Sequence, residues 1–209
     1  VAEVEVDNIL DQVEQYEPEM MSGSPAYLEA ICAGAEAART TLDSVKVLFT
    51  GGAPMAKTGL QRLCAVWPNA RVVIVYGSTE AEPVARIDAN EIIEECYDLS
   101  TAGHGYCVGY PIDEIETCVI PLDFQDDTIG DLRSVELPNN QIGEIAVRGA
   151  HVNTRYWNDP AGEKKNKIQT DTGTWHRMGD AGYQDLRGRL WLVGRPHTAM
   201  RPPWEAHPP

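Results

Sequence analysis

Residues 72–80 read VVIVYGSTE, and the rest of the chain is interpreted from this stretch. The β-branched run 72–75 predicts a buried strand. We expect Tyr76 and Gly77 to end the strand, and the chain then turns through Ser78, Thr79 and Glu80. In open parallel sheets, ligands bind at this carboxyl edge. An aromatic ring, a glycine and oxygen donors suit a nucleotide with its metal ion; the alternative is a helix N-cap at Ser78 or Thr79.

A second strand followed by a turn lies upstream in VKVLFTGGAP, residues 45–54. Val45–Phe49 predicts a buried strand, and Gly51 and Gly52 turn the chain sharply. A helix over about 55–66 would connect it to the strand at 71–76, which makes a βαβ unit and a parallel sheet. Two turns at one sheet edge can line the same crevice, although Gly51 and Gly52 alone are also explained by a tight turn.

Other segments complete the predicted fold. Helices are expected over 8–16, capped by Asn8, over about 24–38, opened by Ser24 and Pro25, and over 88–98. Alternating apolar runs at 115–122, 143–149, 174–178 and 188–194 indicate antiparallel strands, and 157–167 a polar helix or loop. The sequence therefore predicts an α/β fold. A partial parallel βαβ sheet (1–105) precedes a small antiparallel β-barrel-like region (106–195), and 196–209 forms a hinge remnant or disordered tail.

Composition limits the classes of partner. The formal net charge is −15, from 32 acidic and 17 basic residues. Such a surface repels nucleic acid and anionic membranes, so a nucleotide would need Mg²⁺; the alternative reading of the acidity is solubility. Without a long apolar run or a basic–apolar leader, we expect a cytoplasmic protein with no transmembrane segment. The five cysteines include no C-x-x-C and predict mostly buried, reduced thiols.

Several motifs are rejected on spacing. GHGYCVGY, 103–110, lacks the dinucleotide-binding spacing, and neither a Walker phosphate loop nor a hydrolase nucleophile elbow occurs. DFQDDTIGD, 123–131, places Thr128 where a calcium loop requires glycine. His104 and Cys107 form a lone H-x-x-C, which supplies too few ligands for a closed zinc site.

Two later segments offer groups for a nucleotide. In WHRMGDAGYQD, 175–185, Asp180 follows a glycine at the end of a predicted strand, where a carboxylate can accept two hydrogen bonds from a ribose diol. The alternative there is an Asp-Ala-Gly turn. In GRLWLVGRP, 188–196, the planar fork of Arg195 could bind ribose or phosphate oxygens, or lie on the surface.

These pieces occur in the order TGGAP, YGSTE, GEIAVRG, GDAGYQD and GRLWLVGR. In that order the chain resembles the adenylate-forming superfamily of acyl-CoA synthetases, luciferases and nonribosomal-peptide adenylation domains, over about residues 20–198. Within it, VYGSTEAEP and WHRMGDAGYQDLRGRLW are most similar to olefin β-lactone synthetases and related fatty-acid ligases.

The resemblance implies a role for each matching residue. Thr79 would contact the phosphates and Glu80 would bind Mg²⁺, which makes these two the expected catalytic residues. Gly77 would lie at the wall of the acyl pocket, where a side chain would block the carboxylate. Asp180 would hold the ribose hydroxyls, and Arg195 would contact the ribose near an interdomain hinge. The remaining nucleotide-binding residues would be Gly51, Gly52, Ala53, Pro54, Tyr76, which would stack on adenine, and Ser78.

The implied activity is ATP-dependent conversion of a fatty or β-hydroxy acid to acyl-AMP, followed by formation of a coenzyme A thioester or a β-lactone. The cofactors would be ATP, Mg²⁺ and, in a coenzyme A ligase, coenzyme A. The superfamily's phosphate loop and lid lysine have no match, and Pro196, His197 and Thr198 replace the usual Lys/Asp pair at the hinge. We therefore expect a fragment that cannot complete adenylation alone. The alternatives are a non-catalytic nucleotide-binding or interaction module and a structural scaffold.

Overall fold

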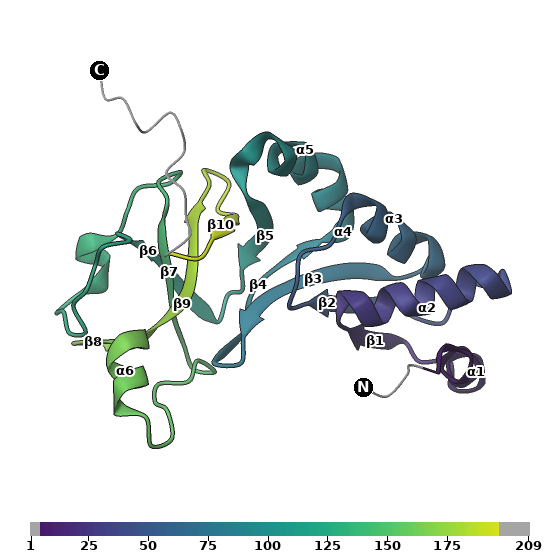
Figure 1. Ribbon diagram of the computed structural model, residues 1–209, viewed down its shortest axis with the longest axis horizontal. Helices are drawn as coiled ribbons and strands as arrows, with labels where there is room; N and C mark the ends of the chain where they lie inside the picture. Colours follow the sequence, from purple (N-terminus) through teal and green to yellow (C-terminus); the bar gives the residue numbers. More distant parts are fainter. Residues whose placement is uncertain (1–4, 197–209) are drawn as a thin grey trace.

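The computed structural model describes residues 5–196 and is elongated, with most of its helices packed beside the N-terminal strands at one end and the C-terminal antiparallel strands at the other (Figure 1). The described strands form one mixed sheet in the order β1-β2-β3-β4-β5-β10-β9-β7-β6, with β8 paired to β9. The predicted α/β class is confirmed. Within the described residues this sheet runs from β1 to β6 without closing, so the region expected to be barrel-like is an open antiparallel sheet.

The first half contains the predicted parallel strands. Strands β2 (Val47–Gly51) and β3 (Arg71–Ser78) are parallel neighbours, and α3 (Lys57–Val66) connects them. This is the βαβ unit expected from the sequence. Strand β1 (Met20–Gly23), which the sequence did not predict, is parallel to β2 on its other side. Helices α1 (Val6–Tyr16) and α2 (Pro25–Ala38) complete this end. One core with the strands contains four fully buried residues of these helices, Leu28, Ile31, Leu60 and Leu63, and Trp67 directly after α3.

The first residues of helices α2 and α1 can be compared with the predicted N-cap residues, Ser24 and Asn8. At α2, the Ser24 hydroxyl accepts a hydrogen bond from the Tyr27 N–H at 3.4 Å and Pro25 is the first helical residue, as predicted. Helix α1 begins at Val6, one turn earlier than the Asn8 cap would allow. Asn8 instead lies inside the helix, where its side-chain oxygen accepts a hydrogen bond from the side chain of Gln12. The predicted N-cap at Asn8 is therefore wrong.

Strand β3 does not end at Tyr76. It continues to Ser78, turns through Thr79 and Glu80, and returns as the antiparallel strand β4 (Ala81–Asp88). The alternative of a helix N-cap at Ser78 or Thr79 is therefore wrong, because no helix follows and Glu80 lies in a hairpin turn. Strand β4 was not predicted from the sequence, because Pro83 argues against a strand that is paired on both sides.

The middle of the chain joins the two halves. A helical segment runs from Ala89 to His104 through α4 (Ala89–Glu91), η1 (Ile92–Cys96), α5 (Tyr97–Leu99) and η2 (Ser100–His104), longer than predicted. Strand β5 (Tyr106–Pro111), which the sequence did not predict, pairs with β4 on one side and β10 on the other. The sheet is therefore hydrogen-bonded across the expected boundary between residues 105 and 106.

The second half is antiparallel, as expected. It contains β6 (Ile115–Ile120), the 3-10 turn η3 (Leu132–Val135), β7 (Gly143–Gly149), α6 (Pro160–Asn166), β8 (Lys167–Thr170), β9 (Gly173–Gln184) and β10 (Leu190–Gly194). Strand β8 was not predicted, and β9 is much longer than the run 174–178. Four of the five cysteines are buried and all are free thiols, as predicted. The helices in residues 5–196 include none that is long and apolar enough to cross a membrane.

Gly51 is required by the close approach of β2 to β3. A Cβ at this position would lie 2.3 Å from the Val75 carbonyl oxygen, which is backbone and cannot rotate away. We expect Gly51→Ala to lower the free energy of unfolding by about 1–3 kcal/mol, measured by urea denaturation. Gly130→Ala is the matched control, because its Cβ would meet the Asp171 carboxylate at 3.4 Å. Equal stability of the two variants would contradict this account.

Candidate functional site

A cavity of about 490 Å³ lies where the turn after β2 faces β3, β5, β9 and β10. It brings together these predicted residues: Gly52, Ala53, Pro54, Tyr76, Gly77, Asp180 and Arg195. Tyr106, Val108 and Leu192 add largely apolar walls that the sequence analysis missed. The Tyr106 hydroxyl accepts a hydrogen bond from the Met55 N–H at 3.3 Å, which ties β5 to the segment after the Gly52 turn.

Asp180 is at the centre of the polar contacts of this cavity. The buried Tyr76 hydroxyl donates a hydrogen bond to Asp180 Oδ2 at 2.7 Å, and Arg195 Nη1 lies 3.1 Å from Asp180 Oδ1. Arg195 also donates to the Gly179 carbonyl oxygen at 2.9 Å. Burial, together with the Asp180 charge, raises the pKa of Tyr76 well above its usual range, so this phenol stays a neutral donor.

Asp180 lies inside β9, so the proposed Asp-Ala-Gly turn is wrong. Gly179 has a φ of +65°, and the pairing of β9 with β7 shifts register between Arg177 and Ala181. Such a bulge re-aims the side chains beside it, and glycine adopts a positive φ without a steric penalty. The local backbone therefore directs Asp180 into the cavity.

Gly52 and Gly77 line the cavity, and each position favours glycine for a different structural reason. Gly52 has a φ of +83°, and a Cβ there would meet nothing within 4 Å, so its conformation is what favours glycine. Gly77 lines the cavity, but a Cβ there would lie 2.6 Å from the Ala81 carbonyl oxygen. The close approach of β4 therefore demands glycine at 77 independently of any substrate, and the role of Gly77 at the wall of an acyl pocket stays a prediction.

The other predicted residues do not line this cavity. Gly51 lies within β2 and Ser78 at the end of β3, while Thr79 is exposed in the hairpin turn. Glu80 instead contacts the segment after β7: the Tyr156 hydroxyl donates to Glu80 Oε1 at 3.3 Å, and the Asn153 N–H donates to the Glu80 carbonyl oxygen at 2.7 Å. The structure thus separates the predicted residues that line the 490 Å³ cavity from Glu80, whose contacts lie with the segment after β7.

Two buried basic residues, Lys167 and His176, interact electrostatically with Glu80 and were missed in the sequence analysis. Lys167 and His176 are 2% and 4% exposed and lie opposite each other on β8 and β9. Burial, together with the Lys167 charge, lowers the pKa of His176. Burial opposes ionisation of Glu80, but its own peptide N–H, the Tyr156 hydroxyl and His176 hold the pKa of the carboxyl below its usual range. Glu80 is therefore a carboxylate at neutral pH.

The ionised Glu80 carboxylate fits Mg²⁺ that is bound together with a nucleotide. Among residues 5–196, no group of three or more His, Cys, Asp and Glu side chains is arranged to hold a metal ion. Mg²⁺ commonly uses one or two carboxylates together with substrate phosphates and water, so a single ionised glutamate suits it.

A second cavity, between α1 and residues 38–44, is similar in volume to the one around Asp180. It is acidic and would repel a polyanion, because it is lined by Asp7, Asp11, Glu14, Glu17 and Asp43.

Comparison with known proteins identifies the family. Residues 2–157 match the AMP-binding enzyme family, and the chain belongs to it. The chain is 30% identical over 192 residues to the olefin β-lactone synthetase of Stenotrophomonas maltophilia, covering 88% of this chain and 34% of that protein. It is also 30% identical over 191 residues to 4-coumarate–CoA ligase 1 of Glycine max, covering 91% and 59%. The chain thus spans about a third of the length of the first relative.

Solved structures agree on the fold. CmiS6 superposes with a TM-score of 0.74 at 20% identity, over 91% of this chain and 43% of its own. The O-succinylbenzoate coenzyme A synthetase of Bacillus subtilis, solved with ATP and a magnesium ion, gives 0.69 at 22% identity, over 91% and 34%. The predicted resemblance to adenylate-forming enzymes is confirmed.

Proposed function

We propose that this chain supplies the adenosine-binding face of an ATP-dependent enzyme that activates a carboxylic acid as its acyl-adenylate. The observation that supports this most directly is the meeting of Tyr76, Asp180 and Arg195 in one cavity beside the Gly52 turn. Tyr76 of β3 and Asp180 of β9 are 104 residues apart in the sequence, and Arg195 directly follows β10. Their arrangement joins an aromatic ring, a carboxylate and a cation at a site of about 490 Å³.

Each residue has a role in holding ATP. Asp180 accepts hydrogen bonds from the ribose hydroxyls, Tyr76 offers its ring to adenine, and Tyr106 and Leu192 contribute apolar surface. Mg²⁺ bound by Glu80 would neutralise phosphate charge. In the reaction, a substrate carboxylate oxygen bonds to the α-phosphorus while the bond between that phosphorus and the bridging oxygen of pyrophosphate breaks. Positioning of the two substrates supplies much of such catalysis.

We further propose a fatty or β-hydroxy acid as the substrate. Similarity to an olefin β-lactone synthetase and to coenzyme A ligases supports this class. With a β-hydroxy acid, attack of its own hydroxyl oxygen on the acyl carbon would expel AMP and close a β-lactone. With coenzyme A, the thiol sulfur would attack the same carbon and give a thioester.

A pyrophosphate-release assay with a panel of fatty and β-hydroxy acids tests the proposal. We expect the 209-residue chain to bind AMP but to release no pyrophosphate above background, because a matching lysine for the developing phosphate charge is absent from its sequence. Robust turnover by this chain would show that its own residues suffice for adenylation. Absence of any AMP binding would refute the proposed adenosine site.

A further inference from the structure

The segment between β7 and α6 holds Glu80 at two points. The Asn153 N–H donates to the Glu80 carbonyl oxygen at 2.7 Å, and the Tyr156 hydroxyl donates to Glu80 Oε1 at 3.3 Å. One contact fixes the backbone and the other the side chain. Glu80 lies in the two-residue turn between β3 and β4, where an uncontacted side chain would sample several rotamers. The two contacts therefore restrict where its carboxylate points.

Lys167 anchors this segment to the sheet. Its Nζ donates a hydrogen bond to the Asn153 carbonyl oxygen and lies 4.9 Å from the centre of the Tyr156 ring. The side chain is 2% exposed, and β8 holds it opposite His176 of β9. A desolvated cation over an aromatic face is a stabilising contact. Lys167 thus contacts both residues that hold Glu80.

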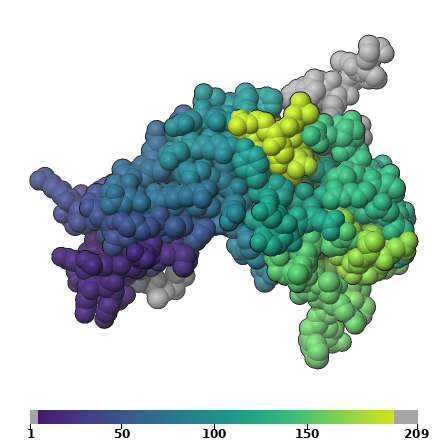
Figure 2. Space-filling view, turned by 180° about the vertical axis from the view of Figure 1, so that it is seen from behind, coloured from purple at the N-terminus to yellow at the C-terminus, as the bar shows by residue number. Residues whose placement is uncertain are grey.

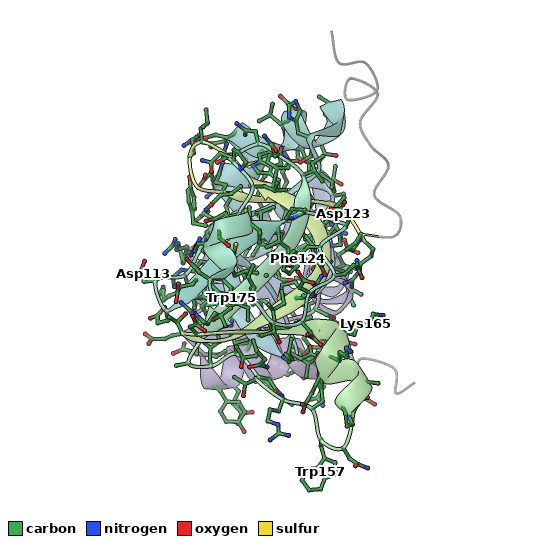
Figure 3. All side chains as sticks on the ribbon, turned by 90° about the vertical axis from the view of Figure 1, so that its left-hand side faces the viewer. Asp113, Asp123, Phe124, Trp157, Lys165 and Trp175 are labelled. Atoms are coloured by element: carbon green, nitrogen blue, oxygen red, sulfur yellow. The ribbon has the colours of Figure 1, made fainter. Side chains whose placement is uncertain are left out.

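Tyr156 is fixed from its own side as well. Its N–H donates to Glu163 Oε1 at 3.0 Å, and Asp159 caps α6 through the Gly162 N–H at 2.9 Å. The next residue, Trp157, is 98% exposed and points away from the body at the tip of the loop (Figure 3). From behind, residues near 155–165 protrude below the molecule (Figure 2). The protruding segment therefore turns one aromatic residue inward to Glu80 and the next outward.

We propose that Tyr156 is a positioning residue for Glu80, and that Lys167 holds Tyr156 and Asn153 so that the glutamate is presented to the divalent cation of a bound nucleoside triphosphate. The inference rests on the proposed function. Neither Tyr156 nor Lys167 lines the 490 Å³ cavity. Because Mg²⁺ demands near-ideal octahedral geometry, a carboxylate that is already aimed binds it better than a mobile one.

The test uses the whole 209-residue chain and Tyr156→Phe, which removes one hydroxyl. The matched control is Tyr110→Phe, since the Tyr110 hydroxyl also donates to a glutamate, Glu91, at 2.9 Å. Calorimetry would measure AMP binding without metal and ATP binding over a range of Mg²⁺ concentrations. We expect Tyr156→Phe to raise the half-saturating Mg²⁺ concentration for ATP binding about five- to tenfold and to leave AMP affinity unchanged. Tyr110→Phe should match the unsubstituted chain in both measurements.

Glu80→Gln provides the reference for complete loss of the metal contribution. If it abolishes the Mg²⁺ dependence while Tyr156→Phe behaves like Tyr110→Phe, the positioning role is overturned and the adenosine site stands. If the unsubstituted chain binds no AMP without metal, the proposed function fails and the inference with it. Lys167→Met should shift the Mg²⁺ dependence in the same direction as Tyr156→Phe; normal Mg²⁺ dependence in that variant would remove Lys167 from the proposal.

Discussion

Replacing Asp180 with alanine is expected to weaken AMP binding by the 209-residue chain about 30- to 150-fold, because two hydrogen bonds from ribose hydroxyls to a charged acceptor are lost. In the structure both carboxylate oxygens have partners, Tyr76 on Oδ2 and Arg195 on Oδ1. A ribose diol would therefore share or displace these donors. Asp180→Asn keeps one acceptor oxygen and should lose less affinity than alanine.

Isothermal titration calorimetry with AMP would measure the loss, and circular dichroism would establish that the variants remain folded. Asp113→Ala is the control for removal of one negative charge, since Asp113 is an exposed residue before β6 (Figure 3). Unchanged AMP affinity in Asp180→Ala would place the nucleotide elsewhere on the chain. Equal weakening by Asp113→Ala would mean that net charge, rather than ribose recognition, controls affinity.

Asp185→Ala is expected to lower the free energy of unfolding by about 3 kcal/mol, because it removes a partner of a buried arginine. Asp185 accepts hydrogen bonds from Arg189 Nε at 2.8 Å and from Trp191 Nε1 at 3.0 Å on Oδ2, and from the backbone N–H groups of Arg187 and Arg189, both at 2.9 Å, on Oδ1. The Arg189 side chain is 6% exposed. Glu91 and Glu95 lie 3.6 and 3.5 Å from its Nη1 and limit the loss.

The same carboxylate predicts a pH dependence. Burial alone would raise the pKa of Asp185, but the hydrogen bonds from Trp191 and Arg189 overcome it and hold the pKa below its usual value. A lowered folded-state pKa contributes stability above the unfolded-state value of about 3.9, and this stability is lost as the pH falls through the folded value. Urea denaturation between pH 7 and pH 3 should show a smaller loss of stability in Asp185→Ala than in the unsubstituted chain.

Asp98→Ala is a suitable control for that series, because it also removes one carboxylate, from an exposed position in α5. Its stability should lie within about 0.5 kcal/mol of the unsubstituted chain. If Asp185→Ala unfolds at the same urea concentration as Asp98→Ala, the hydrogen bonds around Arg189 contribute little net stability. Identical pH curves for all three chains would refute the link to Asp185.

Local patterns predicted the parallel strands well and the joins between strands poorly. The β-branched runs and the helix between them define β2 and β3 from neighbouring residues alone, so that unit was predictable. Strand β4 was not, because Pro83 argues against a strand paired on both sides, and because one of its partners, β5, follows only after the helical segment Ala89–His104 and was itself not predicted. The expected tail from Pro196 falls, from residue 197 onward, outside the described residues.

The residues that line the cavity were partly predictable: apolar runs pointed to Tyr76 and Asp180, although both lie within strands, whereas a polar group buried by tertiary contacts had no local pattern. Asp180 and Tyr76 could be identified because each follows an apolar run. Lys167 could not, because it ends a polar segment, WNDPAGEKKNK, that is typical of solvent-exposed surface. Pairing of β8 with β9 places Lys167 opposite His176 and buries it. The residues next to Lys167 in the sequence show no pattern that would predict this pairing.

The continuous sheet has a consequence for the thermodynamics of ligand entry. The strands β3, β5, β9 and β10 that wall the cavity belong to one hydrogen-bonded ladder, with β4 joining β3 to β5. Their relative positions are therefore fixed before a nucleotide arrives, so those strands lose little conformational entropy on binding. The ordering cost falls instead on side chains such as Arg195, which is the most exposed partner of Asp180.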